Sequence, residues 1–427
     1  MVGRCIIDNI NQLKMITVFY NLLSILIVFT ALFSYLNYRY IKLPSTIGIM
    51  LISLLCSIGL VLTGAIFPEF KQKVVSTVVA VDFGHLLMNA MLSFLLFAGA
   101  VHVDIQSLKK QMISVLTFAT LGVLLSTVII GFCTYLIFPL LGFNIPLIYC
   151  LLFGALISPT DPIAVLGIIS EAKIPGDLKI KIAGESLFND GVGVVIFLSI
   201  LEVAHKGIGN LSVLQITSLF AREAVGGIVW GMLIGYLGFL FLRSIDNYKV
   251  EVLITLAIVM GGYSLAEVMH VSGPLAMVVA GIITGNKAKE FAMSGTTRDY
   301  LGKFWELIDE ILNAILFLLM GFEMLVVKIN KTLIWMGLIA IVIVLLARIV
   351  SVFIPVLFLS FHKTYEKYTI TMLTWGGLRG GISVAMALSI PTGMYQEEFL
   401  TITYLVVIFS ILVQGLTLGK VTKKLYK

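Results

Sequence analysis

Long apolar runs separated by short polar segments make up most of this chain. A helix needs about 20 mostly apolar residues to cross the hydrocarbon core of a bilayer. By that criterion the pattern predicts thirteen spans, and no segment between them is long enough to form a soluble domain. The predicted spans are residues 15–37, 45–66, 83–102, 112–139, 146–170, 182–205, 213–242, 250–269, 272–287, 304–327, 332–360, 368–392 and 398–419. We therefore expect a single all-α polytopic membrane domain over residues 1–427, with about 13 transmembrane helices.

The composition agrees with a chain whose solvent is lipid. Hydrophobic residues make up 59% of the sequence and charged residues only 12%, whereas soluble proteins carry about 25% charged residues. The formal net charge of +6 is spread thinly along the chain, so we expect no nucleic-acid partner. The four cysteines show no spacing typical of a disulfide framework or a metal site. We expect membrane lipid as the surroundings and no cofactor.

The distribution of basic residues predicts the orientation. Of the 29 lysines and arginines, 19 lie in the loops after the odd-numbered spans and in the C-terminal segment, and only 7 lie on the opposite side. Cytoplasmic loops of membrane proteins carry an excess of lysine and arginine. We therefore expect the N-terminus outside and the C-terminus in the cytoplasm, in a cell inner membrane or plasma membrane.

The fifth predicted span contains two prolines near its middle. Pro159 and Pro162 each lack a backbone N–H and clash with the preceding turn, so the helix should unwind there. Unwound backbone at membrane depth is tolerated where it lines a cavity. The carbonyl groups near Thr160 would then be free to bind a cation, with Asp161 beside them. The alternative is a structural kink in which Asp161 caps the following half-helix.

The sixth predicted span carries four polar side chains on one face. Glu185 and Asn189 are four residues apart, and so are Ser186 and Asp190, so the two pairs form neighbouring stripes of a helix. Such a polar face should point into a cavity. Carboxylate, hydroxyl and amide oxygens suit hard cations. The alternative is a buried polar network that serves only helix packing.

Two arginines lie inside predicted membrane spans, where an unpaired charge is costly. Arg348 is in the middle of the eleventh predicted span, so it needs a buried counter-charge, for which we predict Glu185. Arg379 lies among four glycines, which should break the twelfth span (368–392). We expect Arg379 to support the site structurally; the alternative is a purely structural role in which it caps a broken helix.

The two interrupted spans are the fifth and the twelfth. If spans 1–6 are repeated as spans 8–13, the interruptions fall at equivalent positions. The offset of seven spans is odd, which implies inverted repeats. Paired interrupted helices at matching positions indicate a transporter with a binding site at the bilayer midplane.

The polar motifs resemble the monovalent cation:proton antiporter-1 family, which includes the NhaP-type sodium/proton antiporters. The motifs are Ser158-Pro-Thr-Asp-Pro162, Gly184-Glu-Ser-Leu-Phe-Asn-Asp-Gly191, Ala347-Arg348 and Gly376-Gly-Leu-Arg-Gly-Gly381. They occur in the order found in the family, and the thirteen predicted spans cover nearly the whole chain. The Glu-Ser-Leu-Phe-Asn-Asp segment with an upstream Thr-Asp-Pro is the most specific feature.

The resemblance implies a role for each polar residue of the two motifs. Asp190 would be the shared carrier of cation and proton. Thr160 would supply a backbone oxygen and Ser186 a hydroxyl. Asp161 would contact the ion directly or through water, and Asn189 would steady the two broken helices where they cross.

The resemblance also implies how the spans are grouped. Spans 1–3 and 8–10 would form a dimerisation part, and spans 4–6 and 11–13 an ion-translocating core. Span 7 would connect them, and the protein would be a homodimer. Glu185 and Arg348 would be the buried pair. One departure stands out: some family members carry an ion-contacting glutamate in span 3, whereas residues 94–100 contain no acid here.

The function predicted from these residues is secondary active antiport by alternating access, without enzymatic activity. A monovalent cation and a proton would compete for Asp190, because only the neutralised carboxylate can cross a hydrophobic barrier. Sodium is the expected cation, with lithium or potassium as alternatives, and the exchange should be electroneutral at one for one. A gated monovalent cation channel is the alternative reading. An integral membrane enzyme is a further one, but the chain shows no suitable nucleophile or metal cluster.

Overall fold

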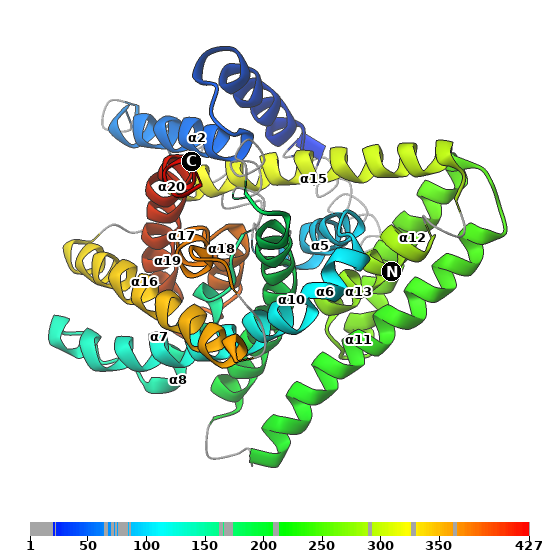
Figure 1. Ribbon diagram of the computed structural model, residues 1–427. Coiled ribbons are helices and arrows are strands. Elements are labelled where there is room, and N and C mark those ends of the chain that lie inside the picture. Colours follow the sequence, from blue (N-terminus) through cyan, green and yellow to red (C-terminus); the bar gives the residue numbers. More distant parts are fainter. Residues whose placement is uncertain are drawn as a thin grey trace, which may run out of the picture.

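The computed structural model is built from helices, and its described part contains no strand (Figure 1). It describes residues 20–21, 23–63, 67–69, 72, 75, 84, 87–161, 165, 174–207, 213–288, 293–325, 330–361 and 365–426. The described helices and helical turns are Leu23–Ile41 with its last turn η1 (Asn37–Ile41), α2 (Ser45–Thr63), η2 (Leu87–Met91), α5 (Leu92–Val101), α6 (Ile105–Thr117), η3 (Phe118–Gly122), α7 (Val123–Ile137), η4 (Phe138–Leu141), α8 (Leu147–Ile157), α10 (Gly176–Lys206), α11 (Val213–Arg243), α12 (Tyr248–Val268), α13 (Gly273–Ile283), η6 (Thr284–Ala288), α15 (Gly295–Glu323), α16 (Lys331–Ser360), α17 (Thr369–Trp375), α18 (Gly381–Leu388), α19 (Gln396–Phe409), η7 (Ser410–Gly415) and α20 (Leu416–Leu425).

Many of these helices suit a membrane. Within the described residues, eight are long and apolar enough to cross a bilayer, and three further apolar helices are shorter. Each predicted span overlaps helical residues in the structure. The main difference is at three starts: α6 begins at Ile105 rather than 112, α10 at Gly176 rather than 182, and α15 at Gly295 rather than 304. Their first turns are polar, and the Ser294 side chain caps α15 by accepting from Thr297 N, so an apolar criterion misses them.

The structure shows interruptions where the prolines and glycines predicted them. Helix α8 ends at Ile157, and residues 158–161 are not helical. Pro162 lies outside the described residues. Helices α17 and α18 are separated by the non-helical residues 376–380. The two unwound segments meet directly, because the backbone N–H of Asp161 donates to the carbonyl of Leu378 at 2.7 Å.

The helices pack in two groups, with α10 next to both (Figure 1). One group contains α6, α7, α8, α10, α16, α17, α18 and α19. The other contains α2, α5, α11, α12, α13 and α15, and we call it the scaffold group. Helix α10 packs on α6 and α8 within its own group and on α11 and α13 of the scaffold group. This arrangement places the polar face of α10 between the interrupted segments and α15.

Candidate functional site

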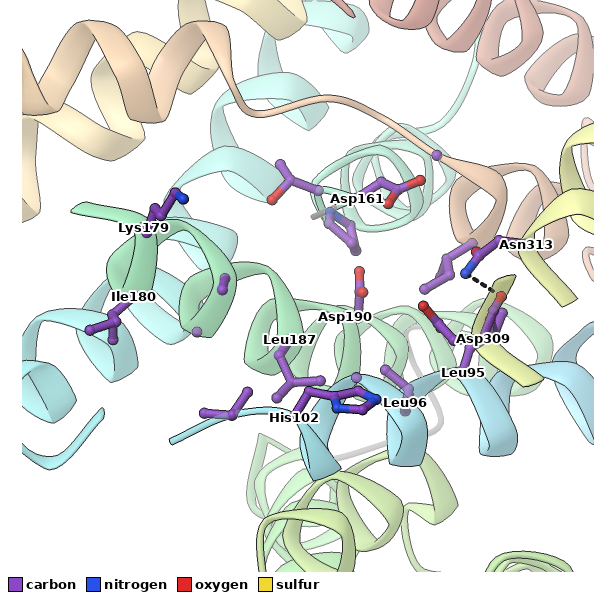
Figure 2. Close-up of a pocket in the computed structure, with 18 of the residues that line it drawn as sticks. Leu95, Leu96, His102, Asp161, Lys179, Ile180, Leu187, Asp190, Asp309 and Asn313 are labelled. Atoms are coloured by element: carbon purple, nitrogen blue, oxygen red, sulfur yellow. Dashed lines mark hydrogen bonds between the residues drawn. The ribbon is translucent and has the colours of Figure 1, made fainter. Parts of the chain in front are cut away.

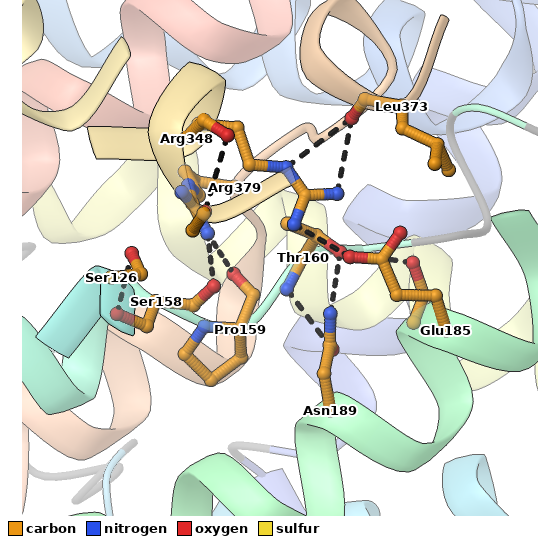
Figure 3. A network of polar contacts seen from close by, with 11 residues as sticks. Ser126, Ser158, Pro159, Thr160, Glu185, Asn189, Arg348, Leu373 and Arg379 are labelled. Atoms are coloured by element: carbon orange, nitrogen blue, oxygen red, sulfur yellow. Dashed lines mark hydrogen bonds and ion pairs between the residues drawn. The ribbon is translucent and has the colours of Figure 1, made fainter. Parts of the chain in front are cut away.

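The first unwound segment is tied to α10 by the two polar stripes predicted from the sequence (Figure 3). The backbone N–H of Thr160 donates to Oδ1 of Asn189 at 3.3 Å, and Nδ2 of Asn189 donates to the Thr160 hydroxyl at 2.8 Å. That hydroxyl also lies 3.0 Å from the hydroxyl of Ser186. All three residues are buried. The backbone N–H of Thr160 has no hydrogen-bond acceptor within a helix, and the amide oxygen of Asn189 takes that place. Such a replacement is needed because buried polar groups require hydrogen bonds.

Asp190 has a different environment from its neighbours on the same helix. It is only 5% exposed, yet its carboxylate accepts no hydrogen bond from any described residue. It lines a cavity of about 640 Å³, together with Thr160 and Asp161 of the unwound segment (Figure 2). The charges of Asp161 and Asp190 act on each other across this space. A buried carboxylate without a protein partner is costly, so the cavity is suited to hold a proton or a cation there.

The cavity has one open end, near the starts of α6 and α10. Its lining there includes the exposed residues His102, Asp104 and Gly176. Hydrogen bonds from Ser107, through its side chain and backbone, and from the backbone of Gln106 lower the pKa of Asp104. Asp104 therefore stays ionised at neutral pH and contributes a negative charge to the cavity lining, to which Lys179 of α10 contributes a positive one.

Two helices pack closely against each other at the cavity wall. Leu316 of α15 and Gly381 of α18 both line it. A Cβ atom added to Gly381 would lie 2.5 Å from a terminal carbon of Leu316, so these two helices leave no space between them at this point.

Arg348 has the buried counter-charge that the sequence predicted. Its Nη1 lies 2.5 Å from Oε1 of Glu185, and the two residues are 6% and 1% exposed. The remaining guanidinium nitrogens Nε and Nη2 donate to the carbonyl of Leu373, at 3.2 and 3.0 Å (Figure 3). The pair links α10, α16 and the C-terminal end of α17, just before the second interruption.

Arg379 contacts the end of the other interrupted helix. Its Nη1 donates to the carbonyls of Ser158 and of Pro159, the latter at 2.9 Å. These carbonyls follow the last residue of α8, where a helix leaves acceptors without partners. The backbone N–H of Arg379 donates to the Ser410 hydroxyl at 2.9 Å. The geometry thus agrees with the capping interpretation of Arg379, and it does not place this guanidinium in the cavity lining.

The glycines beside Arg379 allow a close approach of the two unwound segments. A Cβ atom on Gly380 would lie 2.4 Å from Oδ2 of Asp161. No side chain larger than hydrogen fits there without displacing the carboxylate. The sequence predicted a break at these glycines, and the structure adds that one of them makes room for Asp161.

Sequence reasoning did not place several polar residues in the cavity, among them two on α15. Asp309 and Asn313 of α15 line it, four residues apart on one stripe that continues to Leu316. The polar pair near the start of the predicted span 304–327 was the available signal. Glu323, near the end of the same predicted span, is only 6% exposed. Packing of the surrounding helices, which no local pattern records, buries it.

The comparisons with known proteins agree with this geometry. The family described as sodium/hydrogen exchanger, transmembrane, matches residues 25–424. The chain is 46% identical over 418 residues to the Na⁺/H⁺ antiporter NhaP of Pseudomonas aeruginosa, covering 95% of this chain and 97% of that protein. It is 32% identical over 396 residues to the Na⁺/H⁺ antiporter NhaH of Halobacillus dabanensis, covering 91% and 93%.

A solved structure shares the fold. The sodium proton antiporter MjNhaP1 from Methanocaldococcus jannaschii superposes with a TM-score of 0.75 at 19% identity, covering 97% of this chain and 99% of that one. The resemblance to the monovalent cation:proton antiporter-1 family is confirmed by these matches. With two interrupted helices around a buried aspartate and a family match over nearly its whole length, this multi-pass membrane protein belongs to the transmembrane sodium/hydrogen exchanger family.

Proposed function

We propose that this protein exchanges a monovalent cation, sodium in the first place, for a proton across the cell membrane. The observation that carries the proposal is Asp190, a buried carboxylate without a hydrogen-bond donor among the described residues, in the lining of a cavity of about 640 Å³. Relatives at 46% and 32% identity are named Na⁺/H⁺ antiporters. Lithium and potassium are the other cations that a site of hard oxygen ligands can take.

The cation would be held by oxygens of two elements. Among the described residues, no donor occupies the carbonyl of Thr160, whereas Arg379 occupies those of Ser158 and Pro159. This difference supports Thr160 as the backbone ligand beside Asp190. Asp161 and the Ser186 hydroxyl would complete the site. Asn189, Glu185, Arg348 and Arg379 would hold it in shape. Asn189 and Arg379 bond to the first unwound segment, and Arg348, which is paired with Glu185, bonds to the helix before the second.

Competition for one carboxylate explains obligatory exchange. A bare carboxylate cannot pass through the apolar contact between the helix groups, because its desolvation is costly. The neutral forms, with a proton or a cation bound, can pass. The group containing α10 would move as an ion-translocating core against the scaffold group, which would form the contact of a homodimer, with α11 as the connection. One carrier then exchanges one cation for one proton, without net charge movement.

A channel that uses the same oxygens makes the opposite prediction. It needs a path that is open at both ends, and the close packing of Leu316 against Gly381 supports an exchanger instead.

The distribution of lysine and arginine supports an outside N-terminus and a cytoplasmic C-terminus. On that orientation the cavity, whose mouth includes Asp104 and Gly176, faces the cytoplasm.

The test is cation-driven collapse of a pH gradient in membrane vesicles, run separately with sodium, lithium, potassium and choline. The wild type should respond to sodium and not to choline. Asp190→Asn should abolish the response while protein remains in the membrane, because an amide carries no charge to neutralise. Asp177→Asn is the matched control, since Asp177 lies exposed on the same helix. A normal response from Asp190→Asn would refute the assignment of the carrier.

A further inference from the structure

The scaffold group contributes a carboxylate of its own to the cavity. Asp309 of α15 is partly buried and lines the cavity that Asp161 and Asp190 line from the other group (Figure 2). Its charge and that of Asp161 act on each other. Asn313, one turn further along the same stripe, donates from Nδ2 to the backbone carbonyl of Asp309 at 2.8 Å. Asp309 and Asn313 thus lie one turn apart on the face of α15 that lines the cavity.

The rest of this wall offers a cation few other partners. Leu95, Leu96 and Gly99 of α5 and Leu316 of α15 complete the scaffold side near Asp309, and all four are apolar. Asp190 lies opposite, buried to 95% and without a hydrogen-bond donor among the described residues. The cavity lining carries four carboxylates, those of Asp104, Asp161, Asp190 and Asp309, against one ammonium group, that of Lys179. This excess of negative charge attracts a cation more strongly than Asp190 alone, because the potentials add within a space with low-dielectric walls.

We propose that Asp309 is a second cation-attracting group, which holds a hydrated monovalent cation in the open cavity before the cation reaches Asp190. The proposal rests on the proposed exchange and deepens it, because it assigns how the cation is recruited. Asp309 does not carry the ion across. It raises the cation concentration beside the carrier, so it sets the apparent affinity and leaves the maximal rate unchanged.

The position of Asp309 makes this effect one-sided. Asp309 belongs to α15, which packs on α2 and α5, whereas Asp190 and Asp161 belong to the other helix group. When the two groups move relative to each other, Asp190 leaves the cavity that Asp309 lines. A cation that arrives from the opposite face then meets Asp190 without the help of Asp309. The carboxylate should therefore act on cation binding from one membrane face only.

The experiment measures sodium dependence of exchange in inverted and in right-side-out vesicles. Asp309→Asn should raise the apparent KM for sodium about fivefold in one vesicle type, corresponding to about 1 kcal/mol, with the maximal rate kept. The other vesicle type should show no change. Asp309→Glu should restore the wild-type KM. Glu310→Gln is the matched control, because this neighbouring acid is exposed and lies outside the cavity lining.

A salt series separates an electrostatic role from a structural one. Added choline chloride screens charges in a water-filled cavity, so the KM ratio between Asp309→Asn and wild type should fall as ionic strength rises. An unchanged KM, an equal change in both vesicle types, a salt-independent ratio, or complete inactivity at every sodium concentration would each overturn the proposal. Wild-type vesicles without sodium-dependent exchange would instead refute the proposed function.

Discussion

The buried pair of Glu185 and Arg348 allows a stability prediction that can be worked out from the structure. Glu185→Gln keeps the size of the side chain and removes its charge. The guanidinium of Arg348 then stays buried, at 6% exposure, without its counter-charge. We expect the free energy of unfolding to fall markedly, because an uncompensated charge in a protein interior is costly.

The contacts of Arg348 set the size of the loss. Breaking a buried pair by removing one partner costs about 3–5 kcal/mol. Arg348 keeps two hydrogen bonds to the carbonyl of Leu373 in the variant, so we expect the lower end, about 3 kcal/mol. Adding Arg348→Gln to Glu185→Gln removes the orphaned charge. The double variant should recover part of the loss, with a coupling energy of at least about 1 kcal/mol, as is typical of contacting residues.

The assay is unfolding of the purified protein in mixed detergent micelles with increasing dodecyl sulfate, followed by circular dichroism. Glu202→Gln serves as the matched control, because Glu202 and Lys206 form an ion pair of the same 2.5 Å length on the same helix. Their side chains are 32% and 51% exposed, and pairs of this kind contribute about 0–1 kcal/mol. Burial is thus the variable that distinguishes the two pairs.

Two results would refute this reasoning. A Glu185→Gln variant no less stable than Glu202→Gln would show that the Arg348 charge is compensated by other groups. A double variant equal to the sum of the two single variants would show that Glu185 and Arg348 do not interact energetically. Either result would show that the 2.5 Å contact between Glu185 and Arg348 does not stabilise the protein as argued.

Further predictions concern the cavity and the charge balance. Asp161→Asn should raise the apparent KM for sodium more than it lowers stability, measured by vesicle exchange and by the same unfolding assay; an unchanged KM would assign Asp161 a structural role. Gly380→Ala should reduce the exchange rate at equal protein amounts at least about tenfold, since its Cβ would lie 2.4 Å from Oδ2 of Asp161 and a misplacement of about 1 Å at a site can cost about 10²-fold. Gly302→Ala, with open space around its Cβ, should behave as wild type, and equal rates for the two variants would contradict the steric argument. Exchange in proteoliposomes should not respond to an imposed membrane potential, because a transported net charge would couple at about 2.3 kcal/mol per 100 mV; voltage-driven sodium accumulation without a pH gradient would refute the one-for-one stoichiometry.

Local patterns in the sequence were sufficient for the membrane helices and for the polar face of α10. Apolar runs of sufficient length predict spans because the bilayer has a set thickness. The stripes of Glu185, Ser186, Asn189 and Asp190 follow from helical periodicity alone. The two interruptions follow from the covalent limits of proline and the flexibility of glycine. The counter-charge of Arg348 could also be inferred, because few buried acids were available.

Tertiary packing decided which groups meet at the site. Arg379 caps α8 through carbonyls more than two hundred residues earlier in the chain, and a backbone acceptor has no signature in the amino-acid sequence. Asp309 and Glu310 are adjacent acids on α15, yet one lines the cavity and the other is exposed. Only the rotation of α15 against α5 and α18 separates them, and that rotation depends on packing along whole helices. The sequence by itself therefore determined the spans, their breaks, the polar stripes of α10 and the counter-charge of Arg348, whereas the partners of Arg379 and the place of Asp309 in the cavity depend on contacts between distant helices.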